Sequence, residues 1–447
     1  MRLISSAGMS NPVQNHYRCP ASFFDYTVEG ELPADPDFFQ FGREITCFGR
    51  SSNAEVAFDG ARLRLPFDPA EVVDNLRLER YLGAQRERIG LLRKLYYYVR
   101  PFTNLAARSR IQKFHARNWE KNTFPHWPVD TTVEDTCEKL LLSAMRAQGV
   151  DKVPFIWFWP DSAQAALMMT HDVETVAGRD YCGALMDLND AYGIKASFQV
   201  VPEERYAVPE SFLRSIRERG FDVEVQDLNH DGRLFDDREE FLRRAGLINR
   251  YAREFGARGF RAGVLYRKPE WYGAFDFSFD MSMPNVAPMD PQRGGCCTVM
   301  PYFIGDILEL PVTTVQDYTL FHVLNQHSID LWKTQMELIL KKNGLISFIV
   351  HPDYVIEQKP CSVYKDLLKH IQTVRRENSI WCARPSEIDS WWRARNKMTV
   401  EKEGDSWRIK GKGAERASLA YATSVDGRIV YELDATSETL TRASGTR

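Results

Sequence analysis

The chain has 447 residues, which is too long for one ordinary hydrophobic core, so we expect two or three domains. Hydrophobic residues make up 44% and charged residues 27%, a balance typical of soluble globular proteins that excludes wholesale disorder. The formal net charge of -3 provides no general attraction for nucleic acid, so we expect no nucleic-acid partner.

Residues 1–160 differ from the rest of the chain and predict an N-terminal accessory domain with a helical region. Residues 77–102 have the pattern of a long amphipathic helix, which continues into a basic segment at 107–121. Its arginine and tyrosine content favours a membrane surface or an acidic partner, but packing on the next domain is the interpretation that we prefer. The start of the chain lacks the apolar core and cleavage site of a secretory signal, so we expect a cytoplasmic protein.

Residues 161–395 alternate short apolar runs with helical patterns, as parallel strands alternate with their crossover helices. The seven candidate strands lie at 165–170, 195–201, 221–226, 259–263, 275–282, 307–312 and 345–350. Helical patterns that end in glycine lie at 209–220, 237–256 and 328–344. This α/β pattern predicts a distorted (β/α)7 barrel, and a doubly wound open sheet is the alternative. Residues 396–447 predict a small β-rich extension, with alternating strands and an Asp-Gly turn within 406–433.

The first candidate strand ends in THDVET, where two carboxylates lie two residues apart. Alternate residues of an extended chain share a face, so Asp172 and Glu174 are expected to point into one cavity and His171 away from it. Two carboxylates at one site bind a metal or share a proton unless an arginine compensates their charge. The alternative is that they cap the following helix.

Further polar residues follow other strands of the predicted barrel. His230 follows the third strand, four residues after Gln226; Arg261 lies in GFRAG, and His351 closes LISFIV. Because the carboxyl ends of barrel strands converge on one mouth, we expect these side chains to meet the carboxylate pair there. Carboxylates with an imidazole suit Zn²⁺ or another divalent ion, and a histidine near its ordinary pKa suits a general acid. Taken singly, each residue is equally compatible with a structural role.

In this order the motifs resemble those of the polysaccharide deacetylase family, carbohydrate esterases that share a NodB homology domain and a distorted barrel. The resemblance covers about residues 160–395. It implies that Asp172 is the base beside the metal, that Glu174 is the metal-binding acid, and that His230 and Gln226 occupy the remaining ligand positions. The family has histidine where this chain has Gln226, and usually aspartate where it has Glu174.

The resemblance gives three more residues a role. Arg261 would orient the base and His351 would be the catalytic acid. Asp280, in FSFDMSMPN, would be the acid that supports His351. By this analogy, water bound to a divalent metal, in the first place Zn²⁺, attacks an acetyl carbonyl while His351 protonates the departing amine.

The predicted function is therefore a hydrolase of carbon–nitrogen bonds, an N-deacetylase of an N-acetylated sugar or polysaccharide precursor, with a carbohydrate as its substrate. Gln226 leaves alternatives open, because an amide oxygen is a poorer zinc ligand than imidazole. The site would bind metal weakly, choose a different ion or work without metal, or the enzyme would act on another carbon–nitrogen bond such as that of a cyclic amide or ureide. Alternatively, the chain would be a non-catalytic carbohydrate-binding or scaffolding protein. The sequence does not indicate the oligomeric state.

Overall fold

The computed structural model describes residues 4–5, 11–20, 23–24, 26–28, 57–59, 62–65, 67–83 and 124–434. Contacts between residues divide the chain into two compact units. Unit 1 consists of residues 1–81, 131–163 and 390–447, and unit 2 consists of residues 82–130 and 164–389. All seven predicted barrel strands lie in unit 2. The division into domains at residues 160 and 395 stays a prediction.

The described residues of unit 1 form three small sheets. The first has the order β1 (Ile4–Ser5), β2 (Tyr26–Val28), β4 (Arg62–Leu65) and β3 (Ala57–Asp59). The second pairs β15 (Thr399–Glu403) with β16 (Ser406–Lys410), and the third has the order β18 (Arg428–Leu433), β17 (Leu419–Val425) and β5 (Lys152–Ile156). The strands predicted within 406–433 are present, and the predicted turn joins β17 to β18 with φ of 48° at Asp426 and 75° at Gly427.

The helices of unit 1 are α1 (Pro12–Tyr17), α2 (Pro69–Arg77) and α5 (Thr132–Gln148), and α12 (Pro385–Lys397) enters it from unit 2. The long helix is predicted to begin at residue 77, where α2 ends, and among the described residues the 3-10 turn η3 (Arg80–Leu82) comes next, followed by Gly83 with helical assignment. The rest of that predicted helix and the basic segment at 107–121 lie outside the described residues.

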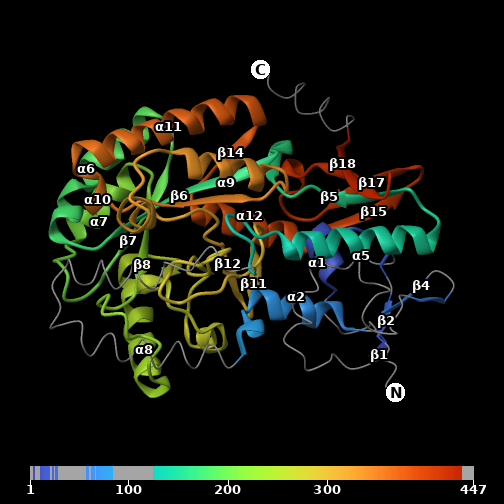
Figure 1. Ribbon diagram of the computed structural model, residues 1–447, viewed down its shortest axis with the longest axis horizontal. Coiled ribbons are helices and arrows are strands. Elements are labelled where there is room, and N and C mark those ends of the chain that lie inside the picture. Colours follow the sequence, from blue (N-terminus) through green and yellow to red (C-terminus); the bar gives the residue numbers. More distant parts are fainter. Residues whose placement is uncertain are drawn as a thin grey trace. The chain divides into compact units, whose positions relative to one another are not determined.

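Unit 2 is built on one curled sheet of nine strands (Figure 1). Seven parallel strands correspond to the seven predicted ones: β6 (Ala165–Val173), β7 (Ala196–Val200), β8 (Asp222–Gln226), β9 (Gly259–Arg261), β10 (Phe279–Asp280), β12 (Ile307–Glu309) and β13 (Leu345–Ile349). Their order in the sheet is β13-β6-β7-β8-β9-β10-β12, and β11 (Tyr302–Ile304) and β14 (Ile380–Cys382) extend it. The mixed α/β architecture is thus as predicted.

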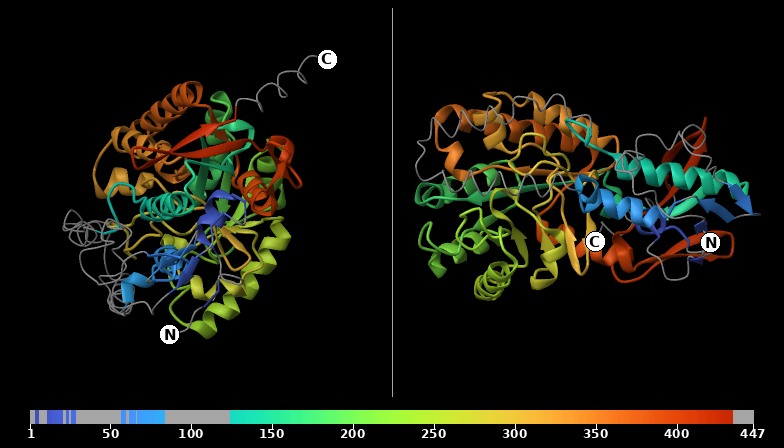
Figure 2. Two further views of the ribbon diagram at one scale, coloured as in Figure 1. Left: turned by 90° about the vertical axis from the view of Figure 1, so that its right-hand side faces the viewer. Right: turned by 60° about the horizontal axis from the view of Figure 1, so that its bottom comes forward.

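Helices surround this sheet, with α8 and α11 on opposite sides of the strands in every view (Figure 2). They are α6 (Val176–Ala191), α7 (Glu210–Glu218), α8 (Arg238–Phe255), α9 (Asp330–Leu340), α10 (Pro352–Val355) and α11 (Gln358–Asn378). The predicted helices at 209–220, 237–256 and 328–344 are α7, α8 and α9. The start of α8 is fixed by Asp237, which accepts hydrogen bonds from two backbone N–H groups, and its end by Gly256 with φ of 60°.

The sheet is not a complete (β/α)7 barrel. The short helices η7 (Gly263–Leu265) and η8 (Pro269–Ala274) join β9 to β10, and β10 reaches β12 through β11, so two crossovers lack an α-helix. In the described sheet β12 and β13 do not pair. Hydroxyl groups bridge this gap instead, since Thr313 and Thr314 donate to the carbonyls of Leu345 and Ser347, each at 2.7 Å.

Alternation along the strands separates an apolar outer face from a polar inner one. Residues such as Leu167, Phe198, Val223 and Phe348 belong to the hydrophobic core shared with the helices. Their neighbours in sequence point the other way, and many of them are polar. These inward-facing residues are Thr170, Asp172, Ser197, Gln199, Glu224, Gln226 and Ser347, all buried. The polar interior lies beneath the mouth at which the strands end.

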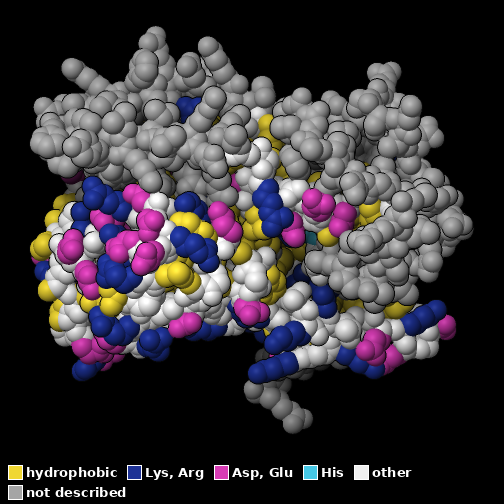
Figure 3. Space-filling model, turned by 90° about the horizontal axis from the view of Figure 1, so that it is seen from below, with side chains coloured by type: hydrophobic (Ala, Val, Ile, Leu, Met, Phe, Trp, Pro, Cys, Tyr) yellow, Lys and Arg dark blue, Asp and Glu magenta, His cyan; other side chains and the backbone are white. Residues whose placement is uncertain are grey.

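Charged side chains are mixed on the face of the molecule seen in Figure 3. Opposite charges also form ion pairs on α8. Arg243 pairs with Glu240 of the same helix at 2.7 Å, and Arg253 pairs with Asp276, which lies outside α8, at 3.0 Å. Among the helices that the structure describes, none combines the length and the apolar character that a membrane span requires.

Candidate active site

Asp172 lies near the end of β6, and His351 follows the neighbouring parallel strand β13, which ends at Ile349. Thr170 of β6 pairs with Ile349, and Asp172 and His351 each stand two residues further along the chain. Both side chains therefore face the same mouth. Asp172 is 3% exposed and His351 4% exposed. The structure thus brings together the two ends of the motif series, which are 179 positions apart in sequence.

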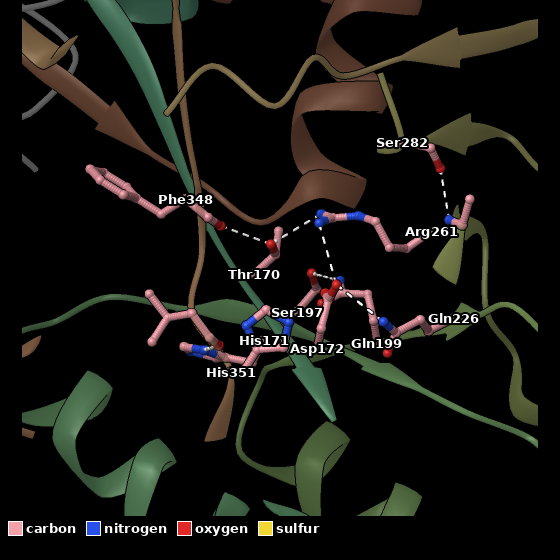
Figure 4. Close-up of polar contacts among 12 residues, drawn as sticks. Thr170, His171, Asp172, Ser197, Gln199, Gln226, Arg261, Ser282, Phe348 and His351 are labelled. Carbon is pink, nitrogen blue, oxygen red and sulfur yellow. Dashed lines mark hydrogen bonds and ion pairs between the residues drawn. The ribbon is translucent and has the colours of Figure 1, made fainter. Parts of the chain in front are cut away.

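Asp172 is held from two sides by polar groups (Figure 4). Gln226 donates from Nε2 to its Oδ2 at 3.3 Å, and Nη1 of Arg261 lies 3.6 Å from the same oxygen. The other oxygen, Oδ1, is buried and has no hydrogen-bond partner in the described part of the chain. Burial raises the pKa of Asp172, and the charges of Arg261 and His351 offset this only in part.

Arg261 is fully buried, and its Nη2 donates to Oγ1 of Thr170 at 3.1 Å. That hydroxyl donates in turn to the backbone carbonyl of Phe348 at 2.7 Å, so the hydrogen bonds run from β9 through β6 to β13 (Figure 4). Arg261 therefore lies beside Asp172, the residue that the resemblance implies as the base.

Glu174 stands between two imidazoles. Its Oε1 lies 3.0 Å from Nε2 of His230 and 3.6 Å from Nε2 of His351. Burial by itself would raise the pKa of Glu174, but His230 and then His351 outweigh burial and lower this pKa well below its ordinary value. Glu174 is therefore a carboxylate whose charge is balanced by histidines.

His230 projects from a turn with unusual backbone angles. Asp227 and His230 have φ of 53° and 54°, in the left-handed region that non-glycine residues seldom adopt. Across from this turn, a Cβ at Gly263 would lie 2.5 Å from Oδ2 of Asp227 and 3.1 Å from Cδ2 of His230. Only glycine at position 263 allows this close approach. His230 lies beside Glu174 in this arrangement. Burial lowers the pKa of His230, but Glu174 and Asp227 raise it more, so that it lies above its ordinary value.

The acid that supports His351 is Asp317, not Asp280. Oδ1 of Asp317 lies 2.6 Å from Nδ1 of His351, and its Oδ2 accepts the backbone N–H of His351 at 2.7 Å. Burial would lower the pKa of His351, but Asp317 and Glu174 together raise it well above 6.5. No motif in the sequence marks Asp317, because it lies eight residues beyond the end of β12 in a segment without strand periodicity.

Asp280 lies on the other side of the site, in a separate carboxyl pair. It pairs in register with Glu309 on the next strand, and it accepts a hydrogen bond from Oγ of Ser282 at 2.7 Å. Burial raises the pKa of Asp280, and burial and the charge of Asp280 raise that of Glu309 well above its ordinary value. A charged Asp280 thus favours the protonated form of Glu309. Asp280 contributes to the surroundings of Arg261 rather than to His351.

His171 points away from the mouth, as expected. Its Nδ1 lies 2.9 Å from the carbonyl of Val350 and its Nε2 lies 2.7 Å from Nδ2 of Asn189. Burial lowers its pKa to about 4, so this histidine is neutral and structural.

The side chains do not form the metal site that the resemblance implied. Within the described ranges, no three His, Cys, Asp or Glu side chains converge as metal ligands would. Glu174 and His230 provide two donors, but Nε2 of Gln226 faces Asp172, and its buried Oε1 has no hydrogen-bond partner. The substitution of an amide for the expected imidazole is the physical reason, and zinc held by three protein ligands does not fit this arrangement.

Comparison with known proteins gives matches only among solved structures. No family model and no curated protein matches the chain. A putative polysaccharide deacetylase from Mycobacterium smegmatis is 16% identical with a TM-score of 0.42, over 56% of this chain and 98% of the other.

Two further structures are each similar to about half of the chain. An allantoinase, Puue, is 13% identical with a TM-score of 0.40, over 53% of this chain and 92% of the other. A family 4 acetyl xylan esterase from Clostridium thermocellum, solved in complex with a cobalt ion, is 13% identical with a TM-score of 0.34, over 51% and 91%.

Proposed function

We propose that the chain is a deacetylase-type hydrolase that removes an acyl group from an N-acylated sugar, with Asp172 as base and His351 as acid. The observation that supports this most strongly is that Asp172 and His351 stand at the same end of two neighbouring strands. The surroundings of each residue raise its pKa. A raised pKa makes Asp172 a stronger base, and a raised pKa favours the protonated form of His351, which a general acid requires. The sugar itself is proposed from the motif resemblance.

In the proposed reaction, the unpaired Oδ1 of Asp172 takes a proton from a water molecule as the water oxygen attacks the amide carbonyl carbon. The negative charge that develops on the carbonyl oxygen is stabilised by the buried cationic groups of Arg261 and His230. His351 then gives its proton to the departing nitrogen as the carbon–nitrogen bond breaks. Asp317 holds the imidazole in place and compensates its charge. No step requires a bound metal.

A second candidate is hydrolysis of a cyclic amide or ureide. Three buried acceptor atoms in the polar interior have no donor among the described residues: Oδ1 of Asp172, Oε1 of Gln199 and Oε1 of Gln226. Unpaired buried acceptors are costly, and a substrate with several N–H groups, such as a cyclic amide or ureide, would satisfy them. Ring opening of hydantoin by the purified protein would favour this candidate.

The test of the proposal is acetate release from N-acetylglucosamine and its oligomers, measured with and without Zn²⁺, Co²⁺ or Mn²⁺. Asp172→Asn should lower the rate by about 100-fold or more, because it removes the general base. Asp180→Asn is the matched control, since Asp180 is 61% exposed on α6. If wild type releases no product from any of these substrates and binds them as well as Asp172→Asn does, the chain is a non-catalytic carbohydrate-binding protein instead. A cytoplasmic location is part of this proposal.

A further inference from the structure

Asp353 joins the start of α10, which follows His351, to the segment after β6 that contains Glu174. It lies two residues after His351, at the start of α10. Its Oδ2 accepts the backbone N–H of Glu174 at 3.1 Å, and its Oδ1 accepts a hydrogen bond from Oγ1 of Thr175. Thr175 is also the N-cap of α6, since its Oγ1 accepts the N–H of Gly178 at 3.2 Å.

The carbonyl side of Glu174 is held by a different element. Nε of Arg205, in the loop after β7, donates to the backbone carbonyl of Glu174 at 3.0 Å. One residue earlier, the hydroxyl of Tyr206 donates to the carbonyl of Val173 at 2.7 Å. Glu174 lies just beyond the end of β6, where the ladder of the sheet no longer supplies partners. Side chains therefore replace the missing ladder bonds on both sides of the peptide.

The space beside Asp353 is closed by Gly178 in the first turn of α6. A Cβ at position 178 would overlap the carboxylate of Asp353. The helix thus has a glycine where its own stability favours alanine, since glycine in a helix interior is less stable by about 1 kcal/mol. The carboxylate of Asp353 fills the space where a Cβ at position 178 would lie, which explains the glycine.

We propose that Asp353 is a positioning residue, which holds the Glu174 peptide so that the Glu174 carboxylate stays between His230 and His351. The inference rests on the proposed function for its catalytic consequence, but the geometry of the contact stands apart from it. Asp353 follows His351 by two residues and accepts the N–H of Glu174. Its carboxylate therefore links the position of Glu174 to that of His351. Asp353 itself contacts backbone N–H and hydroxyl groups and does not act on substrate.

Gly178→Ala is the sharpest test, because it displaces Asp353 while leaving every polar side chain in the sequence. The matched control is Gly183→Ala on the same helix, where a Cβ would meet nothing within 4 Å. Asp353→Ala removes the carboxylate, and Asp353→Asn keeps a side chain able to bond both the Glu174 N–H and Thr175. The readouts are hydrogen exchange of the Glu174 amide by NMR, kcat and KM for acetate release, and melting temperature.

We expect Gly178→Ala and Asp353→Ala to lose protection of the Glu174 amide and to lower kcat by about 100-fold, as small misplacements of reacting groups do, with KM little changed. Gly183→Ala and Asp353→Asn should resemble wild type in both respects. An unchanged Glu174 amide in Gly178→Ala and Asp353→Ala overturns the proposal, as does an equal loss in Gly183→Ala. If wild type has no hydrolytic activity, the proposed function fails, and the exchange measurement still decides the role of Asp353.

Discussion

At the scale of single residues, the site is a balance of three carboxylates against three cationic groups. Asp172 faces Arg261, while Glu174 and Asp317 face the two imidazoles. The pairs of Asp172 with Arg261 and of Asp317 with His351 are buried, and that of Glu174 with His230 is partly buried. The desolvation of a buried charge is expensive unless a partner compensates it. The pKa values of His230 and His351 therefore rise, and that of Glu174 falls.

Replacing Asp317 should shift one limb of the pH–rate profile. Hydrolysis requires Asp172 charged and His351 protonated, so wild-type kcat/KM should rise through a pKa above 3.8 and fall through a pKa above 6.5. Asp317→Asn removes the charge that favours protonated His351, so the alkaline limb should move down by about 1 to 3 pH units. The acid limb should stay in place, and Asp366→Asn, at an exposed position on α11, should change neither limb. An alkaline limb that does not move would show that His351 is not the acid.

Gln226 decides how tightly the site holds a metal. Gln226→His provides an imidazole in addition to Glu174 and His230, so affinity for Co²⁺ should rise by at least about tenfold, seen by calorimetry and by the visible spectrum of the ion. His230→Ala in the Gln226→His background should remove the gain. Tight binding of one equivalent by wild type would contradict our interpretation of the donor set.

At the scale of elements, side-chain hydroxyl groups bridge the gap between β12 and β13, which do not pair with each other in the described sheet. Oγ1 of Thr313 donates to the carbonyl of Leu345 and accepts the N–H of Ser347 at 2.9 Å. Thr313→Val keeps the shape but leaves both buried groups unpaired, so the free energy of unfolding should fall by about 1 to 3 kcal/mol in urea titrations. Thr334→Val, at an exposed position on α9, is the control and should change it by less than about 0.5 kcal/mol. Equal stability of Thr313→Val and wild type would mean that the gap needs no such bridge.

Elements with regular patterns were predictable, and those without them were not. The strands of unit 2 are short and largely buried, and several of them contain or end at a polar site residue, as β6 contains Asp172 and β9 ends at Arg261. The start and end of α8 followed from Asp237 and Gly256. By contrast, β9 and β10 have only three and two residues, and no helical period exists between them to reveal the 3-10 connection.

At the scale of the whole molecule, contacts distant in sequence escaped prediction. The pairing of β5 with β17 joins residues 152–156 to 419–423, and local periodicity has no information about such pairs. The same holds for Asp317 and His351, which meet only because β12 and β13 lie at the two sides of one gap. Residues at strand ends, such as Asp172 and His351, were found because parallel strands bring their carboxyl ends to one edge.

The central claim is that Asp172 and His351 act as one catalytic unit, and a double-mutant cycle in kcat/KM for acetate release tests it most directly. Asp172→Asn, His351→Gln and the double variant should each lose activity to a similar extent, because once one partner is absent the other has little left to contribute. The residual rate of the double variant should be close to that of the weaker single variant. Losses that multiply in the double variant would show that the two residues act independently, and the proposed site would then be wrong.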